Sequence, residues 1–283
     1  MILLLGGSGF IGMNIAATLK KYQIPFISPL HHELNLNEKT NIFKFFEKNN
    51  FETIIWSIST YSSLNISNTI VDHILFRNIL DVCEALNKNI IYLGSMSEVN
   101  FSGKIKNDHY FHKSPISQYG KSKQAISKML ECSPNKIKKY NLRLFGVFGD
   151  GEPNHRLIPS VVNAVNFKLT VKLSDCKQIR DFVNVKVVSE IVIRIIENGA
   201  IPDGLYNIGS GVGIKIKELL LKSVPEPKHN LLEFAAQTRR GTDLDKQIAC
   251  IKKSNKSLGL KQVLNSHMDV MTYLSSKFLD TNF

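Results

Sequence analysis

The sequence has little of several features on which specialised proteins depend. Its 283 residues contain only four cysteines, at positions 83, 132, 176 and 250, and no two of them form a Cys-x-x-Cys motif. This spacing argues against a zinc site or a disulfide framework, so we expect no metal and a reducing, cytoplasmic compartment. No apolar run is long enough to span a bilayer, and residues 1–5 lack the basic start and cleavage site of a targeting segment. We therefore expect no membrane partner.

Acidic residues are scarce as well. The chain has 36 lysines and arginines against 24 aspartates and glutamates, which gives a formal net charge of +12. Such an excess can mark a nucleic-acid surface. Here the lysines are scattered and are not interleaved with aromatic residues, which favours a solvated lysine-rich surface. We therefore expect no nucleic-acid partner.

The bulk composition is otherwise ordinary. Hydrophobic residues make up 43% of the chain and charged residues 21%, as in soluble globular proteins. Nothing in the sequence indicates disorder or internal repeats. The length exceeds that of a typical single core but suits one large α/β unit with a smaller second lobe.

The most informative stretch is the N-terminal one. The apolar run Ile2 to Leu5 ends in glycines at positions 6, 9 and 12, and a segment with helical periodicity continues to Tyr22. This order predicts a strand, a tight turn and the start of a helix. Glycines let the turn close and let backbone N–H groups approach phosphate oxygens, while the helix dipole favours the anion. The stretch therefore predicts the diphosphate site of a dinucleotide.

Two further segments carry polar residues in places suited to chemistry. The run from Asn89 predicts a strand that ends at Ser95, and open parallel sheets place their reacting groups at the carboxyl ends of strands. Farther along, Tyr119 and Lys123 are four residues apart, which puts both on one face of a predicted helix. The ammonium group would then lie close enough to act on the phenol.

The Gly-x-x-Gly-x-x-Gly turn and the segment Tyr119-Gly120-Lys121-Ser122-Lys123 together resemble the extended short-chain dehydrogenase/reductase superfamily of nucleotide-sugar epimerases, dehydratases and reductases. The resemblance covers nearly the whole chain. It implies an α/β fold with a Rossmann-type, doubly wound parallel sheet and a smaller mixed C-terminal substrate lobe. The dinucleotide-binding domain would comprise residues 1–149 and about 179–208, and the substrate lobe about 150–178 and 209–283.

The resemblance also implies catalytic and cofactor-binding roles. Tyr119 would give and take the proton, Lys123 would lower the pKa of Tyr119 and hold the nicotinamide ribose, and Ser95 would hydrogen-bond the reacting oxygen. Ser97 is the fallback for Ser95. Cofactor contacts are expected at Gly6, Gly9, Phe10, Ile11, Gly12, Asn35, Leu36, Ser57, Ile58, Ser59 and Lys123.

For the substrate, the resemblance implies a nucleoside-diphosphate sugar held by two arginines. Residues 177–185 match the family strand Arg-Asp-Phe/Tyr, in which Arg180 would bind the diphosphate, and Arg240 lies in a C-terminal segment with the same role. Ser97 is a further candidate for substrate contact. Gly146 stands where many relatives carry an asparagine that contacts the sugar nucleotide, so that contact is not expected here.

The cofactor prediction rests on a missing acid. In dinucleotide folds, a carboxylate after the second strand binds the ribose hydroxyls of NAD. Here that strand, which starts at Pro25, is followed by Ser28-Pro29-Leu30-His31-His32, without a carboxylate. This favours NADP(H), with NAD(H) possible.

Several reactions stay open at this point. A 4-ketoreductase acting on a 4-keto-6-deoxy sugar is favoured, and a 4-epimerase with tightly bound NAD is the alternative. A 4,6-dehydratase is less favoured because the family's Thr-Asp-Glu is replaced by Met96-Ser97-Glu98, which lacks the acid needed for elimination. A non-catalytic cofactor sensor is also less favoured because Tyr119 and Lys123 are both present. The family often dimerises through the helix that carries the tyrosine, so a homodimer is one possible assembly, but the sequence does not determine the oligomeric state.

Overall fold

The larger sheet of the fold is parallel and has six strands. The computed structural model describes residues 1–59, 68–107, 113–134 and 136–278. The strand order is β10-β6-β4-β3-β1-β2, and all neighbouring strands in it run parallel. The strands are β1 (Ile2–Leu5), β2 (Phe26–Ile27), β3 (Thr53–Trp56), β4 (Asn89–Ser95), β6 (Lys139–Leu144) and β10 (Gly204–Ile208).

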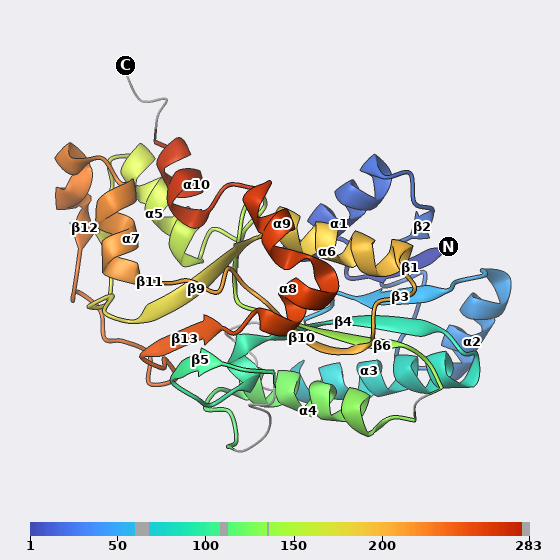
Figure 1. The fold of residues 1–283 in the computed structure, drawn as a ribbon. Helices are drawn as coiled ribbons and strands as arrows, with labels where there is room; N and C mark the ends of the chain where they lie inside the picture. The colour runs from blue at the N-terminus through green and yellow to red at the C-terminus, as the bar shows by residue number, and fades with distance from the viewer. Residues whose placement is uncertain (60–67, 108–112, 135, 279–283) are drawn as a thin grey trace.

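Helices cover both faces of this sheet (Figure 1). The helices α1 (Phe10–Lys21) and α6 (Val185–Glu197) pack together on one face, and α2 (Lys39–Lys48), α3 (Asn68–Ala85) and α4 (Gln118–Cys132) lie on the other. Alternate strand residues serve the two layers: Leu4 and Ile55 join the core under α1 and α6, while Leu3 and Ile54 join the core under α2 to α4. This doubly wound arrangement confirms the predicted fold class.

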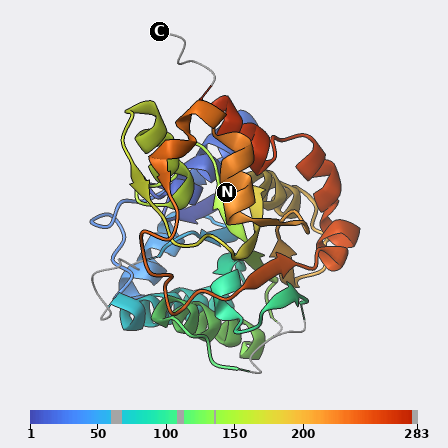
Figure 2. The ribbon, with the colours of Figure 1, turned by 90° about the vertical axis from the view of Figure 1, so that its left-hand side faces the viewer.

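A second, mixed sheet lies beside the first (Figure 2). It has the order β11-β9-β13-β5, with β7 also paired to β9, and it combines parallel and antiparallel neighbours. Its strands are β5 (Gly103–Ile105), β7 (Gly146–Phe148), β9 (Ile179–Asn184), β11 (Gly213–Lys215) and β13 (Lys246–Ala249). A short parallel pair joins β8 (Val171–Lys172) to β12 (Leu232–Glu233).

Three helices of the smaller lobe share a third hydrophobic core with this second sheet. They are α5 (Leu157–Asn166), α7 (Ile216–Ser223) and α10 (Val270–Ser276). Val161, Leu219 and Leu274 are fully buried in this core. A 3₁₀ helix, η2 (Glu226–Leu231), follows α7.

The second sheet also takes strands from the residues expected in the dinucleotide-binding domain, because β5 and β7 lie within residues 1–149 and β9 lies within residues 179–208. The strand β9 belongs to the second sheet, so only α6 and β10 of residues 179–208 join the larger sheet. The helices α8 (Lys252–Leu258) and α9 (Leu260–Asn265) return to the first lobe, where Leu258 and Leu260 enter the core beside α6. Among the described residues, no helix is long and apolar enough to cross a membrane.

Candidate active site

The glycine-rich turn closes tightly between β1 and α1. Gly6 has φ +84°, a left-handed conformation that favours glycine. A Cβ at Gly12 would lie 2.0 Å from the carbonyl oxygen of Gly6, so the first turn of α1 packs directly on the loop. A Cβ at Gly6 would lie 2.8 Å from the backbone of Ser57, which brings the end of β3 against the same turn.

The start of α1 has the features of a diphosphate site. Gly9 is the N-cap, and no side chain caps the helix there. The helical hydrogen bonds begin with the one from the N–H of Met13 to the carbonyl of Gly9, so the N–H groups of Phe10, Ile11 and Gly12 precede the intrahelical ladder. Such N–H groups and the positive end of the helix dipole suit an anion. The glycine cradle therefore fits a dinucleotide at the five turn residues predicted from the sequence.

Of the other predicted cofactor residues, Ser57 and Ile58 lie against this turn, because a Cβ at Gly6 would come within 2.9 Å of the backbone of both. Ser57 and Ile58 are half-buried at the end of β3, and Ser59 is exposed. Asn35 is half-buried, with its side chain accepting from the N–H of Asn37. Leu36 points into the core, and its carbonyl accepts from Asn78, so at this residue only the backbone is placed to meet a ligand.

The end of β2 offers no free carboxylate to a ribose. A Cβ at Gly7 would lie 2.1 Å from the hydroxyl of Ser28, so the serine takes the place beside the glycine turn. The nearest acid along the chain, Glu33, accepts a hydrogen bond of 2.6 Å from the N–H of Leu30.

The structure places the predicted catalytic residues near the carboxyl end of β4. Ser95 ends β4 and caps the 3₁₀ helix η1 (Met96–Glu98), where its hydroxyl accepts from the N–H of Ser97 at 3.2 Å. The first turn of α4 packs on this segment, because a Cβ at Gly120 would lie 2.2 Å from the carbonyl oxygen of Ser97. The neighbour of Gly120, Tyr119, is half-buried at this contact.

Lys123 is held in a buried position beneath the tyrosine. Its ammonium donates to the carbonyl of Leu93 at 3.0 Å and lies 5.9 Å from the ring centre of Tyr119. It also lies 5.0 Å from the ring centre of Tyr92. Burial raises the pKa of Tyr92 well above its ordinary value, so the Tyr92 phenol stays neutral. Of the two tyrosines beside the Lys123 ammonium, Tyr119 is the half-exposed one.

Glu98 has a partner that the sequence did not reveal. The Glu98 carboxylate forms an ion pair with Arg143 of β6, and it accepts a hydrogen bond of 2.6 Å from Ser127 of α4. Glu98 and Arg143 are both fully buried. Because Arg143 bonds one carboxylate oxygen and Ser127 bonds the other, Glu98 is not available as an acid or base for elimination.

A second group of residues gathers around Asp243. The carboxylate of Asp243 lies 3.5 Å from Arg180 and 3.4 Å from Arg240, so the two predicted arginines share one anion. Arg180 is buried, and this burial lowers the pKa of its guanidinium. Arg240 is exposed, whereas its neighbour Arg239 braces the loop through Asp245 and the Asp243 carbonyl. A diphosphate would suit the place that Asp243 occupies between the two arginines.

Gly146 is a glycine because the sheet leaves it no room. A Cβ there would lie 2.8 Å from the carbonyl oxygen of Asp181, on the neighbouring strand β9. The asparagine that many relatives have at this place would therefore collide with the strand. Asp181 itself is committed to the backbone of Ser210, Gly211 and Ala249.

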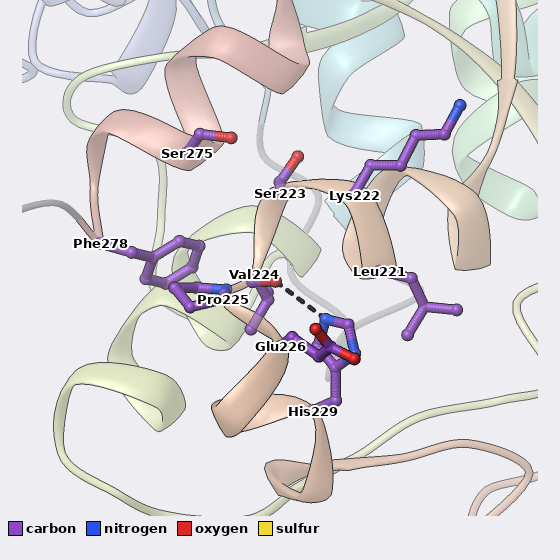
Figure 3. Close-up of a pocket in the computed structure, with 9 residues that line it drawn as sticks. All are labelled: Leu221, Lys222, Ser223, Val224, Pro225, Glu226, His229, Ser275 and Phe278. Atoms are coloured by element: carbon purple, nitrogen blue, oxygen red, sulfur yellow. Dashed lines mark hydrogen bonds between the residues drawn. The ribbon is translucent and has the colours of Figure 1, made fainter.

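The structure has a cavity of about 450 Å³ that is lined by other residues than these groups (Figure 3). It lies in the smaller lobe between α7, η2 and α10, and its wall includes Phe278, Pro225 and His229. His229 is fixed there by the carbonyl of Val224 at 2.9 Å. None of the predicted site residues lines it. Among the described residues, no cluster of His, Cys, Asp and Glu side chains could hold a metal ion.

Known proteins share this fold and sequence pattern. The NAD dependent epimerase/dehydratase family matches residues 2–209. CDP-abequose synthase from Salmonella typhimurium is 26% identical over 282 residues, with 92% of each chain covered. The structure of GDP-mannoheptose C4 reductase from Campylobacter jejuni with NADP bound aligns with a TM-score of 0.79 at 18% identity, over 98% of this chain and 96% of that one. UDP-glucose 4-epimerase from Thermus thermophilus, in complex with NAD, aligns with a TM-score of 0.76 at 19% identity, over 99% of both chains.

The protein is thus a two-lobed α/β protein whose glycine turn fits a dinucleotide. The chain belongs to the NAD dependent epimerase/dehydratase family of nucleotide-sugar-modifying enzymes, which confirms the resemblance seen in the sequence. NAD or NADP is the cofactor typical of this family.

The arginine pair gives a prediction about substrate affinity. We expect Arg180→Lys and Arg240→Lys each to raise the KM for the nucleotide sugar about tenfold with little change in kcat, because lysine keeps the charge but loses the two-pronged contact with phosphate. Steady-state kinetics and a cofactor titration would measure this, and cofactor affinity should stay unchanged. Arg194→Lys is the control, since Arg194 bonds to Leu258 and Gln262 instead. Equal effects at position 194 would contradict the assignment.

Glu152 gives a prediction about pH and stability. Burial raises the pKa of its carboxyl from 4.5 to about 7, against the opposing effect of Arg156. The folded state therefore binds more protons than the unfolded state in this window, and the free energy of unfolding falls as the pH rises from about 4.5 through 7. We expect Glu152→Gln to raise the free energy of unfolding by about 2 to 3 kcal/mol at pH 8 and to leave it unchanged at pH 4. Urea titrations at both pH values would show this, with the exposed Glu47→Gln as control. A gain that is equal at both pH values would rule out titration of Glu152 as its cause.

Proposed function

We propose that the protein is an NADPH-dependent reductase of a 4-keto nucleoside-diphosphate hexose, most suitably a 4-keto-6-deoxy sugar. The observation that carries the proposal is the proximity of Lys123 to Tyr119 beside residues 95–98, here called the serine turn, combined with the bonding of Glu98 to Arg143 and Ser127. Tyr119 would be the proton donor, while Glu98, the residue retained from the dehydratase motif, is bonded to Arg143 and Ser127. This combination favours reduction of a carbonyl over elimination of water.

In the proposed mechanism, each residue has one task. A bound nicotinamide would supply the hydride. The Ser95 hydroxyl would donate to the substrate carbonyl oxygen, with Ser97 as the nearest substitute, and Tyr119 would deliver the proton to that oxygen. Lys123, whose ammonium lies 5.9 Å from the ring centre of Tyr119, would hold the nicotinamide ribose. Arg180 and Arg240 would hold the diphosphate of the substrate.

The preference for NADPH rests on the residues after β2. Glu33, the nearest acid, is bonded to the N–H of Leu30, and Ser28 lies against the glycine turn. A ribose that carries a 2′-phosphate meets no carboxylate from these residues. NAD and an epimerase cycle are the alternative outcome.

One experiment separates the two. The purified protein is denatured, any released nucleotide is identified by mass, and NADPH and NADH are titrated in parallel into the intact protein. Empty protein that prefers NADPH supports the reductase, and consumption of NADPH with 4-keto-6-deoxy nucleotide sugars should follow. Retained, stoichiometric NAD would overturn the proposal in favour of a 4-epimerase, which needs the cofactor to stay bound through two hydride transfers.

A further inference from the structure

The loop between β7 and α5 lies against the start of α1. Asn14 of α1 donates to the carbonyl of Asp150 at 3.0 Å. A Cβ at Gly151 would lie 3.8 Å from the ring of Phe10, the first residue of the helix. The guanidinium of Arg156, at the end of the loop, lies 5.9 Å from the centre of that ring. The loop therefore places a cation beside the helix end that forms the diphosphate cradle.

Arg156 forms an ion pair with Glu152, whose carboxylate is buried but only partly hydrogen-bonded. Arg156 meets Glu152 at 3.1 Å through one carboxylate oxygen, while the other oxygen, Oε2, is buried without a hydrogen-bond partner among the described residues. The Glu152 side chain is only 5% exposed, whereas that of Arg156 is 39% exposed. Burying a carboxylate with an unsatisfied oxygen is costly. The pair is therefore a weak brace, and its cation is free to take a better partner.

Arg156 has the chemistry that a phosphate partner needs. A guanidinium presents a planar fork of donors that matches phosphate oxygens, and it can rest on an aromatic face such as that of Phe10. We propose that Arg156 is a further binding residue for a diphosphate at the start of α1, and that Glu152 holds its guanidinium in place until the diphosphate arrives. The inference rests on the proposed function. Two diphosphates could meet it there, that of the cofactor and that of the nucleotide sugar.

When Arg156 leaves Glu152 for a diphosphate, the Glu152 carboxylate should take up a proton. Glu152 has a pKa of about 7 while Arg156 is beside it, and Arg156 lowers that pKa. Loss of the cation to a phosphate, together with the incoming negative charge, raises the pKa further, so Glu152 takes up a proton near neutral pH. A rise of about one unit from 7 corresponds to an uptake of about 0.4 proton at pH 7.

The other charged groups around the loop do not replace Arg156. Asp150 is occupied by Tyr273 and Lys277 of α10, with Lys186 of α6 at 3.9 Å. The first turn of α1 carries no acidic residue. His155 precedes Arg156 and is exposed. The carboxylate of Glu152 is the group whose burial and incomplete bonding connect it to Arg156.

Calorimetry tests the proposal. NADPH, NADH and the glucose esters of UDP, GDP, CDP and ADP are each titrated at pH 7 in two buffers of different ionisation enthalpy. The dependence of the heat on the buffer gives the number of protons taken up. We expect the wild type to take up about 0.4 proton more than Glu152→Gln on binding the ligand, because glutamine has the shape of glutamate but cannot titrate. The difference cancels any titration of the ligand itself, and the ligand that shows it identifies the diphosphate source.

Substitutions of the cation complete the test. Arg156→Gln should weaken the same ligand about tenfold and remove the proton uptake, while Lys186→Gln should leave both unchanged. Equal proton counts for wild type and Glu152→Gln, or unchanged affinity in Arg156→Gln, would overturn the inference. If neither cofactor binds at all, the proposed function fails first. If a cofactor binds tightly without any difference between these variants, only the role of Arg156 fails. Arg156→Lys, which keeps the charge, guards against a loss of folding in the glutamine variant.

Discussion

Replacing Tyr119 by phenylalanine should reduce kcat by at least about 10²-fold, since a positioned general acid contributes roughly 10²- to 10⁴-fold to rate. The aromatic ring and its contact with the Lys123 ammonium are retained, and only the hydroxyl is lost. Lys123 keeps its bond to the Leu93 carbonyl, so its contact with a cofactor ribose should be unaffected. Cofactor affinity should therefore stay within about twofold of wild type, because no binding contact with a net value near 1 kcal/mol is removed.

A matched control exists in the same neighbourhood. Tyr92 also lies against Lys123, with 5.0 Å between its ring centre and the ammonium, but it is fully buried. Within the described part of the chain, its hydroxyl makes one long hydrogen bond, 3.5 Å, to the Lys123 carbonyl. Tyr92→Phe should therefore leave kcat within about threefold of wild type. Turnover by the Tyr119→Phe enzyme at a rate near that of Tyr92→Phe would remove Tyr119 from the mechanism.

The parts of the site that were predictable are those that the local sequence encodes. The glycine turn is encoded by residue type and spacing, because only glycine fits where a Cβ would lie 2.0 Å from a carbonyl oxygen. Tyr119 and Lys123 follow from the helical repeat. Arg180 and Arg240 could be assigned only through the resemblance, and in the structure both lie around one carboxylate.

The parts that were missed depend on contacts between distant segments. The strand β5 pairs with β13, so that Gly103 lies opposite Gln247, and each strand has only three or four residues. Such short strands carry no reliable periodicity. The domain bounds at residues 179–208 and 209–283 rested on the resemblance, because the local sequence does not encode which sheet or core a segment joins. Arg156 and Glu152 are four residues apart, so their contact could be suspected, but the burial of Glu152 could not.

The ion pair between Glu98 and Arg143 is another contact between distant segments that the sequence did not reveal, and we expect its loss to have a large effect on stability. They are 45 residues apart in the sequence and both fully buried. Arg143 also donates to the side chain of Asn207, whose amide reaches the carbonyl of Ile105 at the edge of the second sheet. Through Ser127 and Gln124, Glu98 is tied to the helix that carries Tyr119. The pair therefore joins the serine turn, the catalytic helix and the second sheet at one point.

Breaking this pair should be strongly destabilising. Glu98→Gln removes the carboxylate that is paired with the buried Arg143 guanidinium, and breaking a buried ion pair costs about 3 to 5 kcal/mol. We expect a decrease of that size in the free energy of unfolding, measured by urea titration. The exposed pair of Glu218 and Lys222 provides the control, because both side chains are about half exposed and Glu218→Gln should have no measurable effect on stability.

The double variant Glu98→Gln/Arg143→Met separates charge from shape. It removes both charges, so its loss should be several kcal/mol smaller than the sum of the two single losses. If the pair only stabilises the fold, the double variant should regain both stability and kcat. If it also positions Ser95 against Tyr119, stability should return while kcat stays low, with the KM for the nucleotide sugar unchanged. We expect the second result, because the hydrogen bond from Ser127 to the Glu98 carboxylate ties the serine turn to α4, and a neutral amide would hold it less firmly. Losses that simply add would show that the two residues do not act as a pair.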